Sequence, residues 1–125
     1  MMKYFLSLGS NINAEKNLDF AANELNKILT NTELSSIHRT EAEGFEGDDF
    51  LNSIFMGESD DSYDELNMKL KSIEDAAGRD RSAPKFSART LDIDIVVQIE
   101  NDEIIFESDE VSKYNFVSEP LKELL

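Results

Sequence analysis

The sequence predicts an α+β fold, in which an antiparallel sheet has helices packed on one face. Two segments, 14–29 and 62–77, carry apolar residues at helical spacing, and short apolar runs with β-branched or aromatic residues lie around them. Along the chain, the order is strand, helix, strand, strand, helix, strand and then a small C-terminal hairpin. This is the split β-α-β order of ferredoxin-like folds. With 125 residues, the chain is expected to form a single domain over 1–125.

The chain begins with an expected strand that is followed by a helix. Residues 2–8 are apolar and aromatic enough for a buried strand, and Gly9-Ser10-Asn11 is expected to end it. The next segment, 14–29, repeats apolar residues every three or four positions, as an amphipathic helix requires. These residues are Leu18, Ala21, Ala22, Leu25, Ile28 and Leu29.

Two further strands are expected before the second helix. Residues 32–40 alternate loosely between polar and apolar, with Leu34 and Ile37 apolar, and predict a second strand. Residues 50–57 form an apolar run that predicts a third strand. Between them, 41–49 carries two glycines and several acidic residues, which is typical of a loop.

The second helix has recognisable signals at both ends. Ser62 and Glu65 have the spacing of a capping box at its start, and Gly78 is well placed to end it. Its apolar face comprises Leu66, Leu70, Ile73 and Ala77. Residues 79–88 contain a proline and show no apolar period, so they are expected to form an exposed loop.

The last part of the chain provides a strand, a hairpin partner and a short helix. Residues 91–99 are rich in isoleucine and valine and predict a strand. Asn101-Asp102 is a turn dipeptide, after which 103–106 is expected to complete a hairpin. Glu119-Pro120-Leu121 is expected to open a short final helix.

Composition excludes several classes of protein and site. The chain carries 12 basic and 27 acidic residues. This excess of negative charge opposes non-specific binding to nucleic acid or to an anionic membrane. It has no cysteine, so disulfides, thiolate metal sites and cysteine nucleophiles are excluded. The apolar runs are far shorter than the roughly 18 residues that span a bilayer, and the N-terminal run is too short for a signal peptide. We therefore expect a cytoplasmic monomer with no nucleic-acid or membrane partner.

Half of the basic residues lie in one short window. Six of the 12 fall between positions 69 and 89, where only three acidic residues accompany them, so the window is locally positive. These six are Lys69, Lys71, Arg79, Arg81, Lys85 and Arg89. Arginine offers a rigid, permanently charged fork to phosphate oxygens, which favours a small, highly charged anion as the ligand. The alternative is a solvated loop whose arginines pair with the abundant acidic residues.

Asp92 and Asp94 lie two positions apart within the expected strand 91–99. Alternate residues of a strand share a face, so both carboxylates are expected to project together, with Cα atoms roughly 6.5–7 Å apart. Paired carboxylates repel each other, and a divalent cation relieves this repulsion; hard oxygen ligands suit Mg²⁺. For the two aspartates alone, the alternative is an exposed strand face with ordinary surface acids. The arginine-rich segment just before them favours the metal interpretation.

Other polar and aromatic features carry weaker signals. Gly9-Ser10-Asn11 is neither a Walker loop nor a dinucleotide fingerprint and is interpreted as a strand-to-helix turn with a polar cap. His38 is the only histidine, and the sequence shows no partner for it. Asn52 lies within an apolar strand, where a buried amide needs hydrogen-bond partners and can find them on a ligand. By themselves, Phe50 and Phe116 are interpreted as core residues.

Taken together, these motifs resemble the 6-hydroxymethyl-7,8-dihydropterin pyrophosphokinase family of folate biosynthesis. The resemblance runs nearly end to end, and its most specific block is Arg-Thr-Leu-Asp-Ile-Asp at 89–94. Weaker blocks agree in order and spacing: Leu-Gly-Ser-Asn (8–11), Arg-Thr (39–40), Phe-Leu-Asn (50–52), Ile-Glu (73–74), Gly-Arg-x-Arg (78–81), and Phe116 with Pro120-Leu121. The family transfers the terminal pyrophosphate of ATP to the hydroxymethyl oxygen of the pterin and releases AMP.

The resemblance implies a role for each matching residue. Asp92 and Asp94 would hold two Mg²⁺ ions that bridge the ATP phosphates and the acceptor oxygen. The catalytic set would be Arg79, Arg89, Asp92 and Asp94, and the nucleotide would be bound by Glu74, Arg79, Arg81 and Arg89. The dihydropterin would be bound by Thr40, Ala42, Phe50, Asn52 and Phe116, with the two phenylalanines on either side of its ring.

Some positions differ from the family pattern. Glu107-Ser108 replaces a Pro-His pair, a basic residue expected near Tyr114 is absent, and Lys71 replaces a polar uncharged residue. Phe86-Ser87-Ala88 replaces Trp-Gly-Pro in the catalytic loop. These differences keep a second hypothesis open, a weakened or non-catalytic paralogue that binds a pterin or a nucleotide. A third hypothesis, a generic interaction domain, leaves the basic window unexplained.

Overall fold

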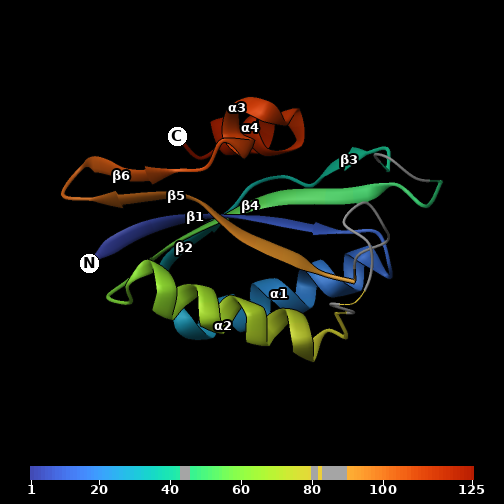
Figure 1. Cartoon of the computed structure of the whole chain (residues 1–125), viewed down its shortest axis with the longest axis horizontal. Helices are drawn as coiled ribbons and strands as arrows, with labels where there is room; N and C mark the ends of the chain where they lie inside the picture. Colours follow the sequence, from blue (N-terminus) through green and yellow to red (C-terminus); the bar gives the residue numbers. More distant parts are fainter. Residues whose placement is uncertain (43–45, 80–81, 83–89) are drawn as a thin grey trace.

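A computed structural model of the chain describes residues 1–42, 46–79, 82 and 90–125 (Figure 1). Within these residues the strands are β1 (Met2–Ser10), β2 (Thr30–Leu34), β3 (His38–Thr40), β4 (Phe50–Ser59), β5 (Asp92–Glu100) and β6 (Glu103–Glu107). The helices are α1 (Ala14–Ile28), α2 (Tyr63–Ala76), α3 (Glu110–Lys113) and α4 (Asn115–Lys122). None of the helices in this part of the chain has both the length and the apolar character needed to cross a membrane.

The strands form one antiparallel sheet, ordered β2-β4-β1-β5-β6 over the described residues, with β3 also paired to β4. β1 is central because it pairs along its whole length with β4 and along most of it with β5. Leu6, for example, lies opposite Phe55 on one side and Ile95 on the other. The α+β, ferredoxin-like fold expected from the sequence is confirmed.

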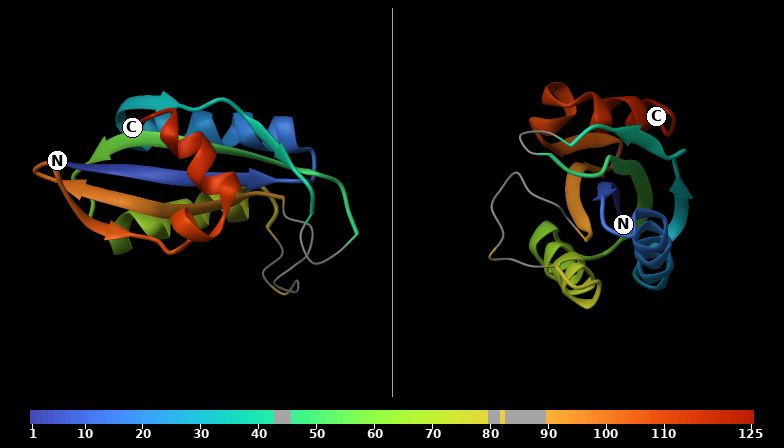
Figure 2. Two further views of the ribbon diagram at one scale, coloured as in Figure 1. Left: turned by 90° about the horizontal axis from the view of Figure 1, so that it is seen from above. Right: turned by 90° about the vertical axis from the view of Figure 1, so that its right-hand side faces the viewer.

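Helices α1 and α2 cover one face of this sheet, as predicted (Figure 2). The core on this face includes Tyr4, Leu6, Leu8, Leu18, Leu25, Phe55, Leu66, Leu70, Ile93 and Ile95. The predicted capping box of α2 is confirmed: Glu65 N donates to Ser62 Oγ at 3.2 Å, and Ser62 N donates to Glu65 Oε1 at 3.1 Å. Gly78 follows α2 with a φ of 95°, the left-handed conformation that ends many helices.

The expectation that all helices lie on one face is wrong. Figure 2 shows α3 and α4 on the opposite face of the sheet. A second core cluster fills this face, formed by Phe5, Ile54, Met56, Val96, Val97, Val117 and Leu121. α4 begins at Asn115, so Pro120 lies inside it and does not open it. Val117 and Leu121, one turn apart, form the small apolar face that packs on the sheet. The helix therefore includes the residues before Pro120.

The predicted strand 32–40 is two strands, and Ser35 lies at the break. Ser35 N donates to Ile54 O at 2.9 Å, while Ser35 Oγ accepts from Ile54 N at 2.8 Å. The side chain thus takes the place of a backbone acceptor, which ends the regular ladder. The predicted hairpin between β5 and β6 is confirmed, since Asn101 and Asp102 have φ values of 52° and 64°, as a type I′ turn requires.

The Tyr4 hydroxyl is a buried polar group in a small network. It donates to Asp61 O at 2.6 Å and accepts from Gln98 Nε2 at 3.1 Å. Burial, and to a smaller extent the charge of Asp61, raise the pKa of Tyr4 to about 12. We expect Tyr4→Phe to lower the free energy of unfolding at pH 7 by about 1–3 kcal/mol, since the substitution removes the hydroxyl from both buried partners.

Urea unfolding measures this effect, with Tyr63→Phe as the control because Tyr63 contacts Phe106 through its ring. The same measurement above pH 10 gives a second result. The unfolded state ionises before the folded state, so the stability of the wild type falls as the pH rises from 10 towards about 12. Tyr4→Phe should lose less stability in that range. Equal unfolding free energies at pH 7 for the wild type and Tyr4→Phe would contradict the role of the network.

Candidate active site

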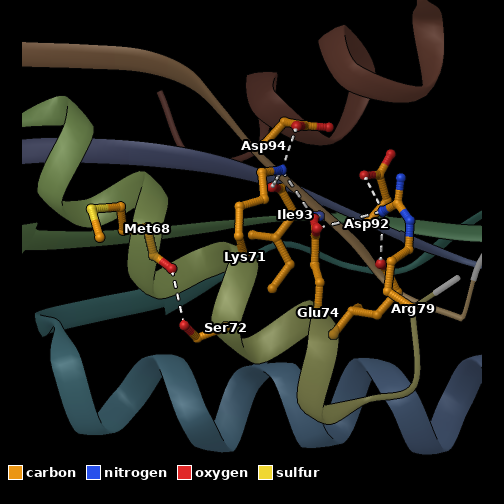
Figure 3. A network of polar contacts seen from close by, with 9 residues as sticks. Met68, Lys71, Ser72, Glu74, Arg79, Asp92, Ile93 and Asp94 are labelled. Atoms are coloured by element: carbon orange, nitrogen blue, oxygen red, sulfur yellow. Dashed lines mark hydrogen bonds and ion pairs between the residues drawn. The ribbon is translucent and has the colours of Figure 1, made fainter. Parts of the chain in front are cut away.

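The candidate site lies where the first half of β5 forms an edge of the sheet. β6 pairs with β5 only from Val97 onward, so residues 92–95 have β1 on one side and no strand among the described residues on the other. The second half of α2 lies alongside this edge (Figure 3). Backbone groups at such an edge need hydrogen-bond partners when they are buried.

Three side chains from α2 and the turn after it satisfy these backbone groups. Arg79 Nη1 donates to Leu91 O at 3.2 Å. Glu74 Oε2 accepts from Ile93 N at 2.7 Å, and Lys71 Nζ donates to Ile93 O at 3.3 Å. Side chains therefore replace a neighbouring strand at this point, and they fix the start of β5 relative to α2.

Asp92 and Asp94 project from the same face of β5, as predicted. Ile93, between them, is buried on the α1–α2 face. Asp92 Oδ1 lies 3.0 Å from Arg79 Nη1, and Asp94 Oδ1 lies 3.4 Å from Lys71 Nζ (Figure 3). The two carboxylate side chains are 39% and 37% exposed, so a ligand can reach both of them.

Two carboxyl groups at this site have raised pKa values. Burial and the nearby Asp92 carboxylate raise the pKa of Asp94 to about 7, although Lys71 acts in the opposite direction. Burial, followed by the charges of Asp92 and Asp109, also raises the pKa of Glu110. Neighbouring carboxylates with raised pKa values are common at functional sites, and a bound cation stabilises their charged forms.

The donors at this site fit a magnesium ion. Asp92 and Asp94 offer hard carboxylate oxygens that are open to a ligand. In the part of the chain that the structure describes, no group of three or more histidine, cysteine, aspartate or glutamate side chains is arranged to hold a metal. Mg²⁺ commonly takes only one or two carboxylates and completes its shell with waters and substrate phosphates, so a pair of aspartates suits it.

Glu74 is fully buried, and its carboxylate is engaged within the protein. Besides accepting from Ile93 N, the carboxylate lies 3.2 Å from Lys71 Nζ and 3.5 Å from Arg79 Nη1. Its expected contact with a nucleotide stays a prediction. Arg79 is also largely buried, and its Nε has no hydrogen-bond partner among the described residues.

Asn52 and Asp92 lie in one row across the sheet. Gly9 of β1 is opposite Asn52 on one side and opposite Asp92 on the other. The predicted end of the first strand at Leu8 is wrong, because Gly9 and Ser10 still pair with β4. A Cβ at position 9 would lie only 3.2 Å from Asn52 Oδ1, so the glycine makes room for this amide. Residues directly opposite in a sheet share a face, which brings Asn52 to the same side as the aspartates.

Three further pterin-binding candidates lie near Asn52. Asn52 is 4% exposed, and its Nδ2 donates to Thr40 Oγ1 at 2.8 Å. Phe50, two residues before Asn52 on β4, shares its face and pairs with Thr40 in the register of β3 and β4. Ala42, which follows β3, is half-buried. The sheet therefore brings Thr40, Phe50 and Asn52 together, with Ala42 close by in sequence.

Phe116 reaches the same side of the sheet from α4. It packs against the second core cluster, which includes Ile54, and Ile54 is two residues from Asn52 on the same face of β4. The Phe116 ring stacks on the ring of Tyr114, with centroids 4.8 Å apart and an interplanar angle of 20°. Tyr114, near which the family resemblance leads us to expect a basic residue, is thus an aromatic neighbour of a pterin-binding candidate.

The contacts of Ser10 and Asn11 were missed by sequence reasoning. Ser10 Oγ is buried and donates to Thr90 O, and Asn11 Nδ2 donates to Asp48 O at 3.0 Å. These bonds tie the end of β1 to the residues just before β4 and β5. The expected polar cap is wrong, because α1 starts after Asn13 without a side-chain cap. The available signal was the polar pair placed directly after a buried apolar strand.

His38 belongs to a surface cluster at the end of α4. Its Nε2 lies 2.5 Å from Glu123 Oε2, and Ser36 Oγ donates to the same oxygen at 2.8 Å. The hydrogen bond with His38, together with those from Ser36, lowers the pKa of Glu123 to about 2. The cluster holds α4 against the β2–β3 connection, which gives this histidine a structural role.

Some sequence-predicted residues lie outside the described part of the chain. Among them are Arg81 and Arg89, two of the phosphate-binding candidates, and Phe86 of the catalytic loop. Most residues of the expected loop 79–88 also lie outside the described part of the chain. Their roles stay predictions.

The motifs and their arrangement agree with a known family. A profile of the 7,8-dihydro-6-hydroxymethylpterin-pyrophosphokinase family matches residues 5–125. The chain belongs to this family. Membership confirms the resemblance seen in the sequence and indicates a pyrophosphokinase of folate biosynthesis, from a family whose enzymes use ATP and Mg²⁺. No curated protein sequence matches the chain.

Proposed function

We propose that the protein transfers the terminal pyrophosphate of ATP to 6-hydroxymethyl-7,8-dihydropterin and releases AMP and the pterin diphosphate. The observation that carries this proposal is the row formed by Asn52, Gly9 and Asp92 across three strands. In this row, a buried amide that can hydrogen-bond the edge of a heterocycle lies on the same face of the sheet as Asp92, with β1 between them. An acceptor bound at Asn52 would therefore lie close to phosphates bound at Asp92 and Asp94.

Asp92 and Asp94 would hold two Mg²⁺ ions, which supply positive charge to the ATP phosphates and to the acceptor oxygen when bound. The exposure of both carboxylates leaves them accessible to these ions. Phosphoryl transfer depends mainly on positioning and on charge neutralisation, and rigidly held carboxylates serve both needs. The fixed start of β5 would hold the two aspartates in place for this chemistry.

Arg79 would bind phosphate, together with Arg81 and Arg89. Its guanidinium contacts Asp92 through Nη1, and its buried Nε has no hydrogen-bond partner within the described part of the chain. Glu74 would lie beside the nucleotide, and its buried carboxylate also orients Arg79 and Lys71. A guanidinium that is already oriented loses little rotamer freedom when it binds an anion.

The dihydropterin would bind through Asn52, Thr40 and Ala42, between the rings of Phe50 and Phe116. Asn52→Ala is expected to weaken pterin binding at least about tenfold, since it leaves polar atoms of the heterocycle without partners. Mg-ATP affinity should stay unchanged. Isothermal titration with each ligand measures both values, and Gln98→Ala, which removes another buried amide far along β5, is the control. Equal losses for pterin and Mg-ATP would indicate damaged folding and not a pterin contact.

A specific observation favours the second candidate, a paralogue that binds a pterin or a nucleotide without turnover. Ser108 stands where the family has a histidine, and a basic residue is expected near Tyr114. Both side chains are engaged within the protein. Ser108 N donates to Val96 O at 2.8 Å, and its Oγ accepts from Glu110 N at 3.2 Å. Tyr114 is stacked on Phe116. Neither side chain replaces the positive charge that the family pattern provides.

Product analysis separates the two candidates. The purified chain is incubated with ATP, Mg²⁺ and 6-hydroxymethyl-7,8-dihydropterin, AMP is quantified, and the pterin is examined by mass spectrometry. AMP together with a pterin diphosphate is the expected result. A folded protein that binds the pterin but forms neither product would exclude the pyrophosphokinase and support the binding paralogue.

A further inference from the structure

Lys71 holds a positive charge directly beside the candidate metal ligands. Its Nζ lies 3.4 Å from Asp94 Oδ1, 3.2 Å from Glu74 Oε2 and 3.3 Å from Ile93 O (Figure 3). It reaches this place from α2, across the edge of the sheet where β5 has no neighbouring strand in the described part of the chain. The ammonium group thus stands between a buried carboxylate and an accessible one.

The surroundings of Lys71 keep this charge in place. Glu74 is fully buried, and its carboxylate lies 3.2 Å from Lys71 Nζ, so the lysine has a charged partner inside the protein. Ile93 O provides a second acceptor at the sheet edge. The lysine side chain is 35% exposed, which leaves it some freedom, but both of these partners remain when Asp94 takes another ligand. A cation that reached Asp94 would therefore meet the ammonium group at close range.

We propose that Lys71 is an intramolecular counter-ion of Asp94 that competes with a divalent cation for this carboxylate. The inference rests on the proposed assignment of metal to Asp92 and Asp94. In the absence of nucleotide, the lysine supplies part of the neutralisation that a metal would otherwise supply, and it repels that metal. Lys71 thereby lowers the affinity of the aspartate pair for metal alone and shifts metal binding towards the complex with the phosphates of ATP.

Metal binding to the full chain without nucleotide tests this proposal independently of turnover. Mn²⁺ is a suitable probe, since it takes the same carboxylate and water ligands as Mg²⁺ and can be followed by electron paramagnetic resonance. Lys71→Gln is expected to bind Mn²⁺ about tenfold more tightly than the wild type, because it removes a like charge within a few ångströms of the ion. Lys71→Arg keeps the charge and should restore weak binding.

Two variants locate the effect. Lys69→Gln removes the same charge from the same helix, but Lys69 pairs with Asp61 at 2.7 Å, so its Mn²⁺ affinity should equal that of the wild type. In the double variant Lys71→Gln with Asp94→Asn, the gain in affinity should disappear. Thermal unfolding of each variant confirms that folded proteins are compared.

The outcomes separate this inference from the proposed function. If the wild type and Lys71→Gln bind Mn²⁺ with equal affinity, or Lys71→Gln binds it more weakly, competition by Lys71 is wrong and the metal assignment stands. If the gain persists in the double variant, the ion lies elsewhere and the proposal is also overturned. If neither folded protein binds Mn²⁺, the assignment of metal to Asp92 and Asp94 fails, and the role of Lys71 fails with it.

Discussion

Asp94→Asn is expected to lower the rate of AMP release by at least about a thousandfold. The substitution keeps the size of the side chain but removes the negative charge of a carboxylate that we propose as a metal ligand. Loss of metal-assisted charge stabilisation is worth several kcal/mol, and each 1.4 kcal/mol corresponds to about a factor of ten in rate. The measurement is AMP formation at saturating Mg²⁺, ATP and dihydropterin.

Asp102→Asn is the matched control for this experiment. It makes the same substitution in the same hairpin, at the far end of β5, where the φ of 64° suits asparagine as well as aspartate. Its rate should equal that of the wild type. Turnover by Asp94→Asn at the wild-type rate would contradict the assignment of Asp94 to the metal.

Glu74→Ala is expected to destabilise the protein by about 3–5 kcal/mol. The change removes the acceptor of Ile93 N and a negative charge that faces Lys71 and Arg79. It also leaves a cavity in the space that the buried side chain filled. Breaking a buried charge pair from one side leaves the other charges uncompensated, which is the costly case. Urea unfolding of the wild type and the variant measures the difference.

Two further variants interpret the result. Glu74→Gln keeps an acceptor for Ile93 N and loses only the charge, so its loss should be smaller, about 1–3 kcal/mol. Glu24→Ala breaks the pair of Glu24 with Lys27, which has the same spacing on α1 but lies at the surface, and should cost about 1 kcal/mol or less. A loss for Glu74→Ala as small as that for Glu24→Ala would show that the buried cluster contributes little to stability.

The regular part of the fold could be predicted because apolar residues recur along it with the spacing of a helix or of a strand. The predicted helix over 14–29 ends one residue from the observed end of α1, and the turn at Asn101-Asp102 has the backbone conformation that the hairpin needs. The shared face of Asp92 and Asp94 followed from strand alternation alone. These features are local, so a single sequence carries their signal.

Features that depend on tertiary docking could not be predicted in this way. The residues of α4 show a short apolar face, but only the completed sheet determines that this face covers the side opposite α1 and α2. Glu74 is another example. It lies four residues after Leu70, so the helical period places it at the margin of the apolar face. Its burial is explained only by β5, where Ile93 N donates to the Glu74 carboxylate and not to a neighbouring strand.

Family resemblance supplied the expected roles of the site residues, whereas the structure shows how these residues lie relative to one another. The sequence alone does not indicate that Gly9 separates Asn52 from Asp92 by one strand, because strand neighbours are set by register and not by chain order. The same limit applies to Lys71. Its helical position was visible in the sequence, but the carboxylate that it contacts belongs to a strand more than twenty residues later.

The edge of β5 that has no neighbouring strand among the described residues also has a consequence for self-association. A row of free backbone donors and acceptors at a sheet edge invites strand pairing with another molecule, which is a common route to aggregation. In this protein, Lys71, Glu74 and Arg79 occupy those groups with charged side chains, and charges at an edge disfavour such pairing. The residues that arrange the candidate active site therefore also protect this edge from pairing with another molecule. Loss of Glu74 would expose backbone groups to intermolecular strand pairing and would also weaken the fold.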